Sequence, residues 1–261
     1  MSQQIHPTAV IAADVKLGND VVVGPFAVIE HDVEIGDGCR IGTHAVIQPF
    51  VKMGKGNTVH PHVVLGDLPQ DTSFKAETVS WLIIGDNNVF REGFTAHRSS
   101  KERGETRIGS GCFLMNNSHV AHDCVLGDGV IFANNVAIGG YVEVGDKVFM
   151  GGNVVAHQFC RIGAYAMVQG TTGLSMDVIP YTIIGGHYAK HYKLNTVGLR
   201  RAGITGARYN ALSAAFRLLR HRQPLDNLEE TEEIRFLKTW LTVKSKRGVH
   251  GFVDVAKADD D

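Results

Sequence analysis

The fold of this 261-residue chain is decided by residues 5–47, which divide into hexapeptides as IHPTAV IAADVK LGNDVV VGPFAV IEHDVE IGDGCR IGTHAV I. A large apolar residue opens each hexapeptide, and a smaller apolar residue follows four positions later. The first series contains Ile5, Ile11, Leu17, Val23, Ile29, Ile35, Ile41 and Ile47, and the second contains Ala9, Val15, Val21, Ala27, Val33 and Cys39. A period of six fits neither the 3.6 of a helix nor the two of an exposed strand, so it indicates a solenoid.

The repeat extends far beyond this stretch. The large residue recurs at Met53, Val59 and Leu65, and a second register opens at Ile84 and Phe90 and then runs from Ile108 to Leu174 in steps of six. Three hexapeptides close one triangular coil of about 18 residues, and about 24 hexapeptides make roughly eight coils. The sequence therefore predicts a parallel β-helix over residues 1–185. Prisms of this kind are left-handed, against the usual right-handed crossover preference.

Two interruptions break the repeat. Residues 66–83 shift the register by one, and residues 97–107, HRSSKERGETR, are too polar and charged to line a narrow apolar core. Because loops that leave a rigid scaffold are common sites of function, both excursions are candidates for substrate contact.

The pattern ends after Val178-Ile179-Pro180, and residues 186–261 are predicted to form a small α-helical domain. One helix has Tyr209, Leu212, Phe216 and Leu219 on a single face, with Thr205 as its N-cap and Pro224 beyond its end. A second helix is expected from Leu228 to about Val243, and the last four residues, ADDD, are expected to be frayed. Between Val178 and Leu225 the chain has eight basic residues and no acidic one, which favours contact with an anionic partner. The alternative is a solvated helical face.

Composition excludes several classes of protein. The chain has 26 basic and 27 acidic residues and a pI near 6.9, so it is not a general nucleic-acid packer. Hydrophobic residues make up 44%, which is enough for a core, and no apolar run approaches the length of a membrane span. The start, MSQQIHPTAV, has neither the basic nor the apolar region of a signal peptide, and a cytoplasmic protein is expected.

The four cysteines follow the repeat. Cys39, Cys112, Cys124 and Cys160 each lie four residues after a large inward residue, at the small inner corner of a coil. We therefore expect buried thiols that pack as small apolar groups, with no disulfide and no metal.

One column of residues has the composition of a catalytic site. His122 lies in the stretch NNSHVAHDC (116–124), and one coil later Gly140 stacks above it, followed by Gln158. Tyr141 likewise stacks above Asp123. An imidazole is the natural general base near neutral pH, and a glycine N–H stabilises an oxyanion. The residues alone leave two alternatives open, namely turn residues without chemistry and the ligands of a metal.

Several motifs resemble one family over nearly the whole chain. NNSHVAHDC, FANN (132–135), AHQFC (156–160), the Gln70-Asp71 pair and NTVGLRRAG (195–203) are similar to the UDP-N-acetylglucosamine O-acyltransferases of lipid A biosynthesis. The resemblance implies that an (R)-3-hydroxyacyl chain, delivered on the phosphopantetheine of acyl carrier protein, moves to the 3-hydroxyl of UDP-N-acetylglucosamine in the first step of that pathway. It implies no other cofactor.

The resemblance also implies roles for individual residues. His122 would be the general base, Asp123 would orient it, and the Gly140 N–H would face the thioester oxyanion. Substrate contacts would come from Gln70, Asp71, His119, His157, Gln158, Asn195 and Arg201. Gly170 would form the floor of an acyl groove, and a homotrimer with sites between neighbouring subunits is expected.

Some positions depart from the family pattern. Ser73 replaces a usual lysine, Tyr141 replaces a histidine, Ala202 follows the pair Arg200-Arg201, and Ser99 replaces a glycine in the second excursion. These positions concern contacts to sugar and phosphate rather than the base. The first alternative is therefore a related acyltransferase for another nucleotide sugar, with an amine as a candidate acceptor. A zinc-dependent hexapeptide carbonic anhydrase and an inert scaffold are the remaining alternatives.

Overall fold

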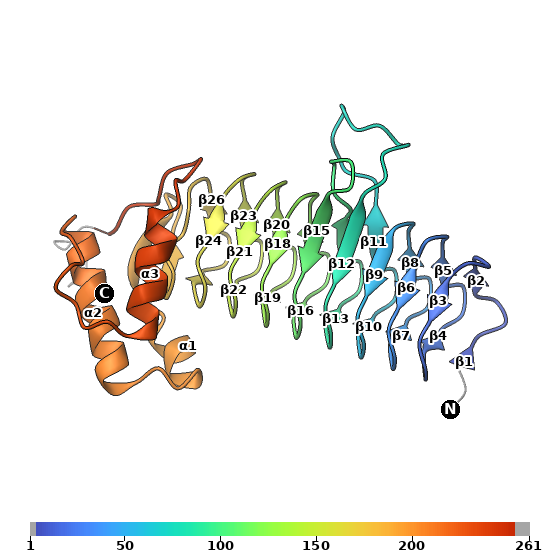
Figure 1. The fold of residues 1–261 in the computed structure, drawn as a ribbon, viewed down its shortest axis with the longest axis horizontal. Helices are drawn as coiled ribbons and strands as arrows, with labels where there is room; N and C mark the ends of the chain where they lie inside the picture. Colours follow the sequence, from blue (N-terminus) through green and yellow to red (C-terminus); the bar gives the residue numbers. More distant parts are fainter. Residues whose placement is uncertain (1–3, 254–261) are drawn as a thin grey trace.

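The computed structural model describes residues 4–253 and shows a long triangular prism with helices at one end (Figure 1). It is the left-handed parallel β-helix that the repeat predicts, followed by a small α-helical region. Most strands are two residues long, and up to β26 successive strands belong to successive faces. The tail at 258–261, expected to be frayed, lies outside the described residues.

Three parallel sheets form the faces. The first sheet contains β1 (Gln4–Ile5), β4 (Val22–Val23), β7 (Arg40–Ile41), β10 (Thr58–Val59), β13 (Val89–Phe90), β16 (Phe113–Leu114), β19 (Ile131–Phe132), β22 (Phe149–Met150), β25 (Met167–Val168), β27 (Thr182–Gly185) and β28 (Lys190–Leu194). The second contains β2 (Val10–Ile11), β5 (Val28–Ile29), β8 (Val46–Ile47), β11 (Val64–Asp67), β14 (Thr95–His97), β17 (His119–Val120), β20 (Ala137–Ile138), β23 (Val155–Ala156) and β26 (Gly173–Leu174). The third contains β3 (Lys16–Leu17), β6 (Glu34–Ile35), β9 (Val51–Met53), β12 (Trp81–Ile84), β15 (Glu105–Ile108), β18 (Val125–Leu126), β21 (Glu143–Val144) and β24 (Arg161–Ile162).

The core is the apolar interior of the prism. From Val23 to Leu174 the large residue of each hexapeptide is at most 5% exposed, because the coils above and below cover it. At the first coil the same position is open, and Ile5 is 43% exposed. Turn residues with a left-handed backbone close the corners, among them Asp32, Asn135 and Tyr165. The hexapeptide thus supplies the inward residue, the inner corner and the turn.

Both excursions leave the prism at the edge where the second sheet meets the third. One loop spans 68–80, between β11 and β12, and the other spans 98–104, between β14 and β15; Figure 1 shows them projecting together from this edge. Residues 97–107 were expected to stay out of the apolar core, but only 98–104 leave the prism. Glu105–Ile108 form β15, and Thr106 is fully buried opposite Leu82, because its hydroxyl accepts from the Asp123 N–H at 2.7 Å. Arg98 and Ser99 are buried nonetheless, because residues of the first loop bond them, and His97 at the end of β14 is buried as well.

The C-terminal region differs in detail from the sequence prediction. It consists of α1 (Thr196–Arg201), α2 (Gly206–Arg220) and α3 (Glu232–Thr242), and β28 pairs antiparallel with β27 before the helices begin. The sequence analysis did not predict β28 or α1. Helix α3 begins four residues after Leu228 because the side chain of Thr231 caps it by accepting from the Ile234 N–H. Thr205 occupies the N-cap of α2 but makes no side-chain cap bond.

Candidate active site

The centre of the site is an imidazole–carboxylate pair on the edge between the second and third sheets. His122 and Asp123 lie in the turn between β17 and β18, and Asp123 has the left-handed backbone of a corner residue. The distance between His122 Nδ1 and Asp123 Oδ2 is 2.7 Å, and the two side chains are 12% and 8% exposed. With Nδ1–H donating to the carboxylate, Nε2 of His122 is the nitrogen that can accept a proton.

The second excursion supplies further donors to Asp123. The Ser99 hydroxyl donates to Oδ1 at 2.5 Å, and the Ser100 hydroxyl and N–H donate to Oδ2 at 2.7 and 3.1 Å. Burial raises the pKa of Asp123, but the hydrogen bonds from His122, Ser99 and Ser100 outweigh burial and hold the pKa well below its usual value. From the sequence, the departures at Ser99 and Tyr141 were expected to concern contacts to sugar and phosphate rather than the base. That expectation is wrong, because Ser99 bonds Asp123 and the Tyr141 ring packs against the His122 ring. Ser100 was not identified, and its only signal was that it interrupts the repeat.

Gly140 packs directly against the imidazole, as the coil spacing predicts. A Cβ on Gly140 would lie 2.6 Å from Cε1 of His122, so only glycine leaves the ring in place. Within residues 4–253 the Gly140 N–H has no hydrogen-bond acceptor. The Tyr141 ring meets the His122 ring edge to face at 5.4 Å, and His157 and Gln158 lie exposed one coil further on. The arrangement leaves a backbone N–H beside the base.

Two more imidazoles lie next to the pair on the second sheet. Burial is the main cause that lowers the pKa of His119 to about 4, and its Nδ1 lies 2.7 Å from the Thr95 hydroxyl. His97 is 4.7 Å away, ring to ring; burial lowers its pKa as well, and its Nδ1 has no hydrogen-bond partner among the described residues. Both rings are therefore neutral at neutral pH.

The first excursion brings an acidic side chain to the same edge. The hydroxyl and N–H of Ser73 donate to Asp71 Oδ1 at 2.7 and 2.9 Å, and these bonds lower the pKa of Asp71. The charges of His122 and Asp123 also act on the Asp71 carboxyl, so the loop lies within electrostatic reach of the pair. Gln70 is exposed beside it. The structure thus brings together at this edge the expected site residues His122, Asp123, Gly140, Tyr141, His119, Asp71 and Ser73.

Asn195 and Arg201 lie elsewhere on the same chain. They line a pocket of about 740 Å³ on the first sheet, together with Ile131, Phe149, Met167 and Tyr165. Two groups within the chain already bond the Asn195 side chain, which accepts from the Gly198 N–H at 3.1 Å and donates to the Tyr165 carbonyl at 2.8 Å. The first sheet is the face opposite the edge that holds His122. No single chain brings these two sets of residues together.

Gly170 occupies a third place, the turn between β25 and β26 where the first and second sheets meet. It is exposed, and a Cβ at this position would lie 3.2 Å from the Gly152 carbonyl oxygen one coil below. Neither glycine places a side chain at its own position on this edge, although Asn153 and Thr171 follow them in the same turns.

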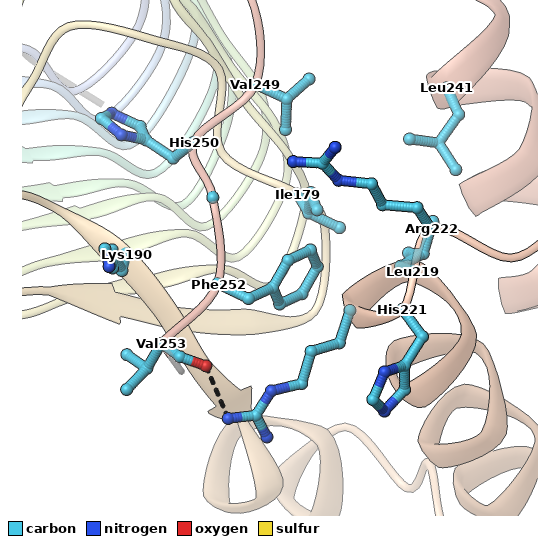
Figure 2. A pocket seen from close by; sticks show the side chains of 12 residues that line it. Ile179, Lys190, Leu219, His221, Arg222, Leu241, Val249, His250, Phe252 and Val253 are labelled. Carbon is cyan, nitrogen blue, oxygen red and sulfur yellow. Dashed lines mark hydrogen bonds between the residues drawn. The ribbon is translucent and has the colours of Figure 1, made fainter. Parts of the chain in front are cut away.

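A second cavity lies within the helical region (Figure 2). It has a volume of about 680 Å³ between the end of α2 and the segment 249–253, and Lys190, Arg220, Arg222, His221 and His250 are among its lining residues. Arg220 Nη2 donates to the Val253 carbonyl oxygen at 2.6 Å. No carboxylate lines this cavity among the described residues. Residues of the basic stretch identified in the sequence therefore line this cavity as well as the surface of a helix.

The cysteines are buried and free, as expected. All four are at most 1% exposed, and burial raises the pKa of the Cys124 thiol to about 12 and that of Cys112 to about 11. Across residues 4–253 no three histidine, cysteine, aspartate or glutamate side chains converge in the manner of a metal site. No helix in the same range is both long enough and apolar enough to cross a bilayer.

Comparison with known proteins gives a consistent result. Residues 177–254 match the second domain of UDP-N-acetylglucosamine O-acyltransferase, and residues 32–67 and 105–140 match the bacterial transferase hexapeptide family. The chain is 47% identical over 254 residues to an acyl-(acyl-carrier-protein)–UDP-N-acetylglucosamine O-acyltransferase of Campylobacter jejuni, which covers 95% of this chain and 96% of that protein. A match of 44% identity to the protein of that name from Anaeromyxobacter covers 60% of this chain and 61% of the other. The solved structure of a UDP-N-acetylglucosamine acyltransferase from Campylobacter jejuni superposes with a TM-score of 0.89 at 35% identity, covering 96% of this chain and all of the other.

Proposed function

This chain belongs to the UDP-N-acetylglucosamine O-acyltransferase family, and we propose that it transfers an (R)-3-hydroxyacyl chain from acyl carrier protein to UDP-N-acetylglucosamine, the first step of lipid A synthesis, with His122 as the general base. The observation that supports this role most directly is the contact between Gly140 and the His122 ring. It unites a base held by a carboxylate with a backbone N–H that lacks an acceptor. Such a pair suits attack by a hydroxyl on a thioester.

In the proposed reaction His122 carries one proton from the sugar hydroxyl to the leaving thiolate. Nε2 of His122 takes the proton of the sugar 3-hydroxyl as its oxygen attacks the thioester carbonyl carbon. The carbonyl oxygen becomes an oxyanion, which the Gly140 N–H stabilises. The carbon–sulfur bond then breaks, and the phosphopantetheine thiolate takes the proton from the His122 imidazolium. Asp123 stays ionised throughout and favours the imidazolium that forms between the two transfers.

The remaining residues on this edge bind the acceptor in the proposal. Asp71 lies near the pair, and both of its hydrogen bonds from Ser73 go to Oδ1, so Oδ2 is the oxygen proposed to accept from a sugar hydroxyl. Gln70 and Gln158 are exposed on the same edge. His119 is neutral at neutral pH, which suits a hydrogen bond to a sugar rather than to an anion.

A neighbouring copy of the chain completes the site in this proposal. Arg201, the cation expected on the pyrophosphate, lies on the face opposite His122, and Gly170 lies on another edge. In a threefold arrangement the face of one prism meets the edge of the next, which would bring both sets of residues to one substrate. The homotrimer is therefore part of the proposed function. The acyl chain would then follow this edge past Gly152 and Gly170.

The basic helical region is the proposed docking surface for acyl carrier protein, whose helices are acidic. Arg217 is exposed on α2, and the cavity of Figure 2 adds Lys190, Arg220 and Arg222 to the same region. Association should weaken as salt is added, since exposed charges are screened within about 8 Å at physiological ionic strength. Arg217→Glu should weaken binding and remove part of the salt dependence. Arg235→Glu on α3 reverses a charge outside the basic stretch and is the matched control.

One observation favours a second acceptor. Tyr141 and Ser73 both lie at the edge where the sugar is expected, and both depart from the residues usual in the family. The alternative function is acyl transfer by the same base to the amine of another nucleotide sugar, with Nε2 of His122 taking the proton of the attacking amine.

Mass spectrometry of reaction mixtures tests the proposal. UDP-N-acetylglucosamine and its 3-amino analogue are offered separately, with 3-hydroxyacyl carrier proteins of about 10 to 16 carbons. An acylated UDP-sugar, lost in a folded His122→Ala variant, is the expected result and identifies acceptor and chain length together. Equal turnover in that variant would remove His122 from its role. Failure of both acceptors with a folded wild-type protein would contradict the proposed function.

A further inference from the structure

The segment Arg98–Ser100 joins two parts of the site that the proposed mechanism treats separately. At one end, Ser99 and Ser100 bond the carboxylate of Asp123. At the other end, Arg98 bonds the loop 68–80, which holds the expected sugar contacts. We infer that this segment is a positioning element which couples the acceptor loop to the His122–Asp123 pair and sets the proton affinity of the base. The inference rests on the proposed role of His122.

Arg98 is an unusual anchor. It is 3% exposed, and its guanidinium donates to the Thr78 carbonyl oxygen at 2.5 Å and to the Ser80 hydroxyl at 3.1 Å. Its Cζ atom lies 5.2 Å from the ring centres of both Phe50 and Phe74. Burial lowers the pKa of Arg98, with Asp67 opposing the change. A buried cation held between two rings and backbone oxygens fixes the loop in one position, because moving the loop would leave the charge without partners.

The backbone transmits this position to the serines. Ser99 follows Arg98 directly, its N–H donates to the Trp81 carbonyl oxygen at 3.3 Å, and its carbonyl oxygen accepts from the Ser80 hydroxyl at 2.5 Å. Ser99 is fully buried. Ser99 is therefore bonded on both sides, to Ser80 at the end of the first loop and to Trp81 at the start of β12, and it has little freedom to move apart from them.

At Asp123 the serines compete with His122 for the same charge. Oδ2 accepts from His122 Nδ1, from the Ser100 hydroxyl and from the Ser100 N–H. A carboxylate with several donors stabilises a neighbouring imidazolium less than one with a single donor, because its charge is already shared. The serines therefore favour the neutral imidazole, which is the form that accepts a proton from the substrate.

Other groups also act on the pair. Asp71 adds a negative charge from the first loop, and His97 and His119 interact with His122 from the second sheet. On the third side the Tyr141 hydroxyl lies 3.1 Å from the Ser100 hydroxyl, and Lys101 Nζ lies 4.7 Å from the centre of the Tyr141 ring. A test of the serines must leave these five side chains in place, so single-hydroxyl substitutions are used; among the described residues Ser100→Ala removes, besides the hydroxyl bond to Asp123, only the contact with the Tyr141 hydroxyl.

The first measurement is an NMR titration of histidine-labelled protein, with the His122 signal assigned from its loss in His122→Ala. In Ser100→Ala the titration midpoint of His122 is expected to move to higher pH by about half a unit to one unit, since Asp123 then acts more strongly on the imidazolium. Ser100→Thr keeps the hydroxyl and should restore the wild-type midpoint. Ser110→Ala, which removes a half-buried hydroxyl bonded to the Asp86 N–H, is the matched control. Equal midpoints in Ser100→Ala and Ser110→Ala would overturn the inference.

The second measurement tests the coupling. Arg98→Met keeps an unbranched apolar side chain and removes the guanidinium. It is expected to raise KM for the nucleotide sugar about fivefold to tenfold. It should also move the titration midpoint of His122 in the same direction as Ser100→Ala. The double variant should shift the midpoint by less than the sum of the two single shifts. A change in KM without any shift would overturn the coupling. If Arg98→Met fails to fold, Arg98→Lys keeps the charge, and the titration midpoint of His122 is measured in that variant instead.

The two readouts separate this inference from the proposed function. The acid limb of kcat/KM should move with the NMR midpoint if His122 is the base. If the wild-type protein acylates no nucleotide sugar, the proposed function fails, whereas the NMR midpoint of Ser100→Ala still decides whether the serines tune the imidazole.

Discussion

The edge that holds His122 and the first-sheet pocket that holds Asn195 and Arg201 differ in how complete they are within one chain. At the edge, base, carboxylate, backbone N–H and two loops are already in contact, and Asp123 alone accepts hydrogen bonds from three residues. In the pocket, Arg201 is exposed and the Asn195 amide is bonded within its own chain.

The two regions differ because proton transfer and substrate binding make different demands on geometry. A proton-transfer pair needs positions fixed to a fraction of an ångström, which one rigid prism edge provides. A nucleotide diphosphate extends much further than one corner, so its cation can come from a different surface. One chain can therefore build the reacting pair and still depend on its neighbour to hold the substrate.

Mixing two impaired variants is the most direct test of whether one active site takes residues from two subunits. His122→Ala should lose about 10³-fold in activity, and Arg201→Ala, assayed with the nucleotide sugar well below KM, should keep only about a tenth of wild-type activity. If each site takes His122 from one subunit and Arg201 from the next, trimers reassembled from equal amounts should recover about a quarter of wild-type activity, because a mixed trimer has one intact site in three.

The recovery is measured as acyl transfer after the two variants are coexpressed or unfolded and refolded together. Mixing His122→Ala with Asp123→Asn is the control, because both changes affect one edge and no intact site can form. Absence of recovery in the first mixture would show that a single chain supplies both residues.

Gly140→Ala tests how rigid the edge is. The added methyl group would lie 2.6 Å from His122 Cε1, so the ring must move, and a shift of about 1 Å in a reacting group costs about 10²-fold in kcat. We expect this loss in kcat with little change in KM. Gly251→Ala, where the Cβ would meet open space, is the control for the substitution itself. Wild-type kcat in Gly140→Ala would mean that the imidazole is not held where the structure places it.

Arg201→Ala should produce the opposite kinetic pattern. Loss of one charge-assisted hydrogen bond to a phosphate should raise KM for the nucleotide sugar about tenfold and leave kcat within about threefold. Steady-state kinetics at saturating donor measures both values. Arg235→Ala, an exposed arginine on α3, is the matched control. A loss confined to kcat would place Arg201 in the chemical step and remove the contrast between the two regions.

The smallest expected effect concerns stability. His191 is fully buried in the helical region; its Nε2 accepts from the Ile179 N–H at 3.0 Å, and burial lowers its pKa to about 4. The unfolded imidazole binds a proton near pH 6.5, so the contribution of neutral His191 is complete above that pH and is lost as the pH falls toward 4. We expect the free energy of unfolding to drop by about 3 kcal/mol over this range.

Denaturant unfolding at several pH values measures this drop. His191→Gln keeps an acceptor for Ile179 and cannot be protonated, so its curve should be flatter between pH 6.5 and 4. His119→Gln gives the matching test on the catalytic edge, where burial also lowers the histidine pKa to about 4. Parallel curves for wild type and His191→Gln would contradict the assignment.

Much of the fold followed from the repeat, because a period of six leaves only one way to bury a large residue in every hexapeptide. The same spacing predicted that Gly140 packs on His122, since stacked coils are 18 residues apart. The spacing also predicted the buried corner cysteines. By contrast, β28 and α1 follow no repeat and were not predicted. The last helix begins at Glu232, after the N-cap Thr231, rather than at Leu228, because one side-chain cap decides this boundary.

The sequence by itself determined the prism, the family resemblance and the alignment of His122, Asp123 and Gly140, because these depend on spacing along a regular coil. Only the tertiary structure decided that Ser99 and Ser100 hold Asp123 and that Arg98 is buried beneath the first loop, because the two loops obey no repeat and meet through contacts of long sequence separation. It also decided that Arg201 lies opposite the base. The spacing of the repeat determines which residues share an edge, whereas only tertiary packing determines which residues the two loops contact.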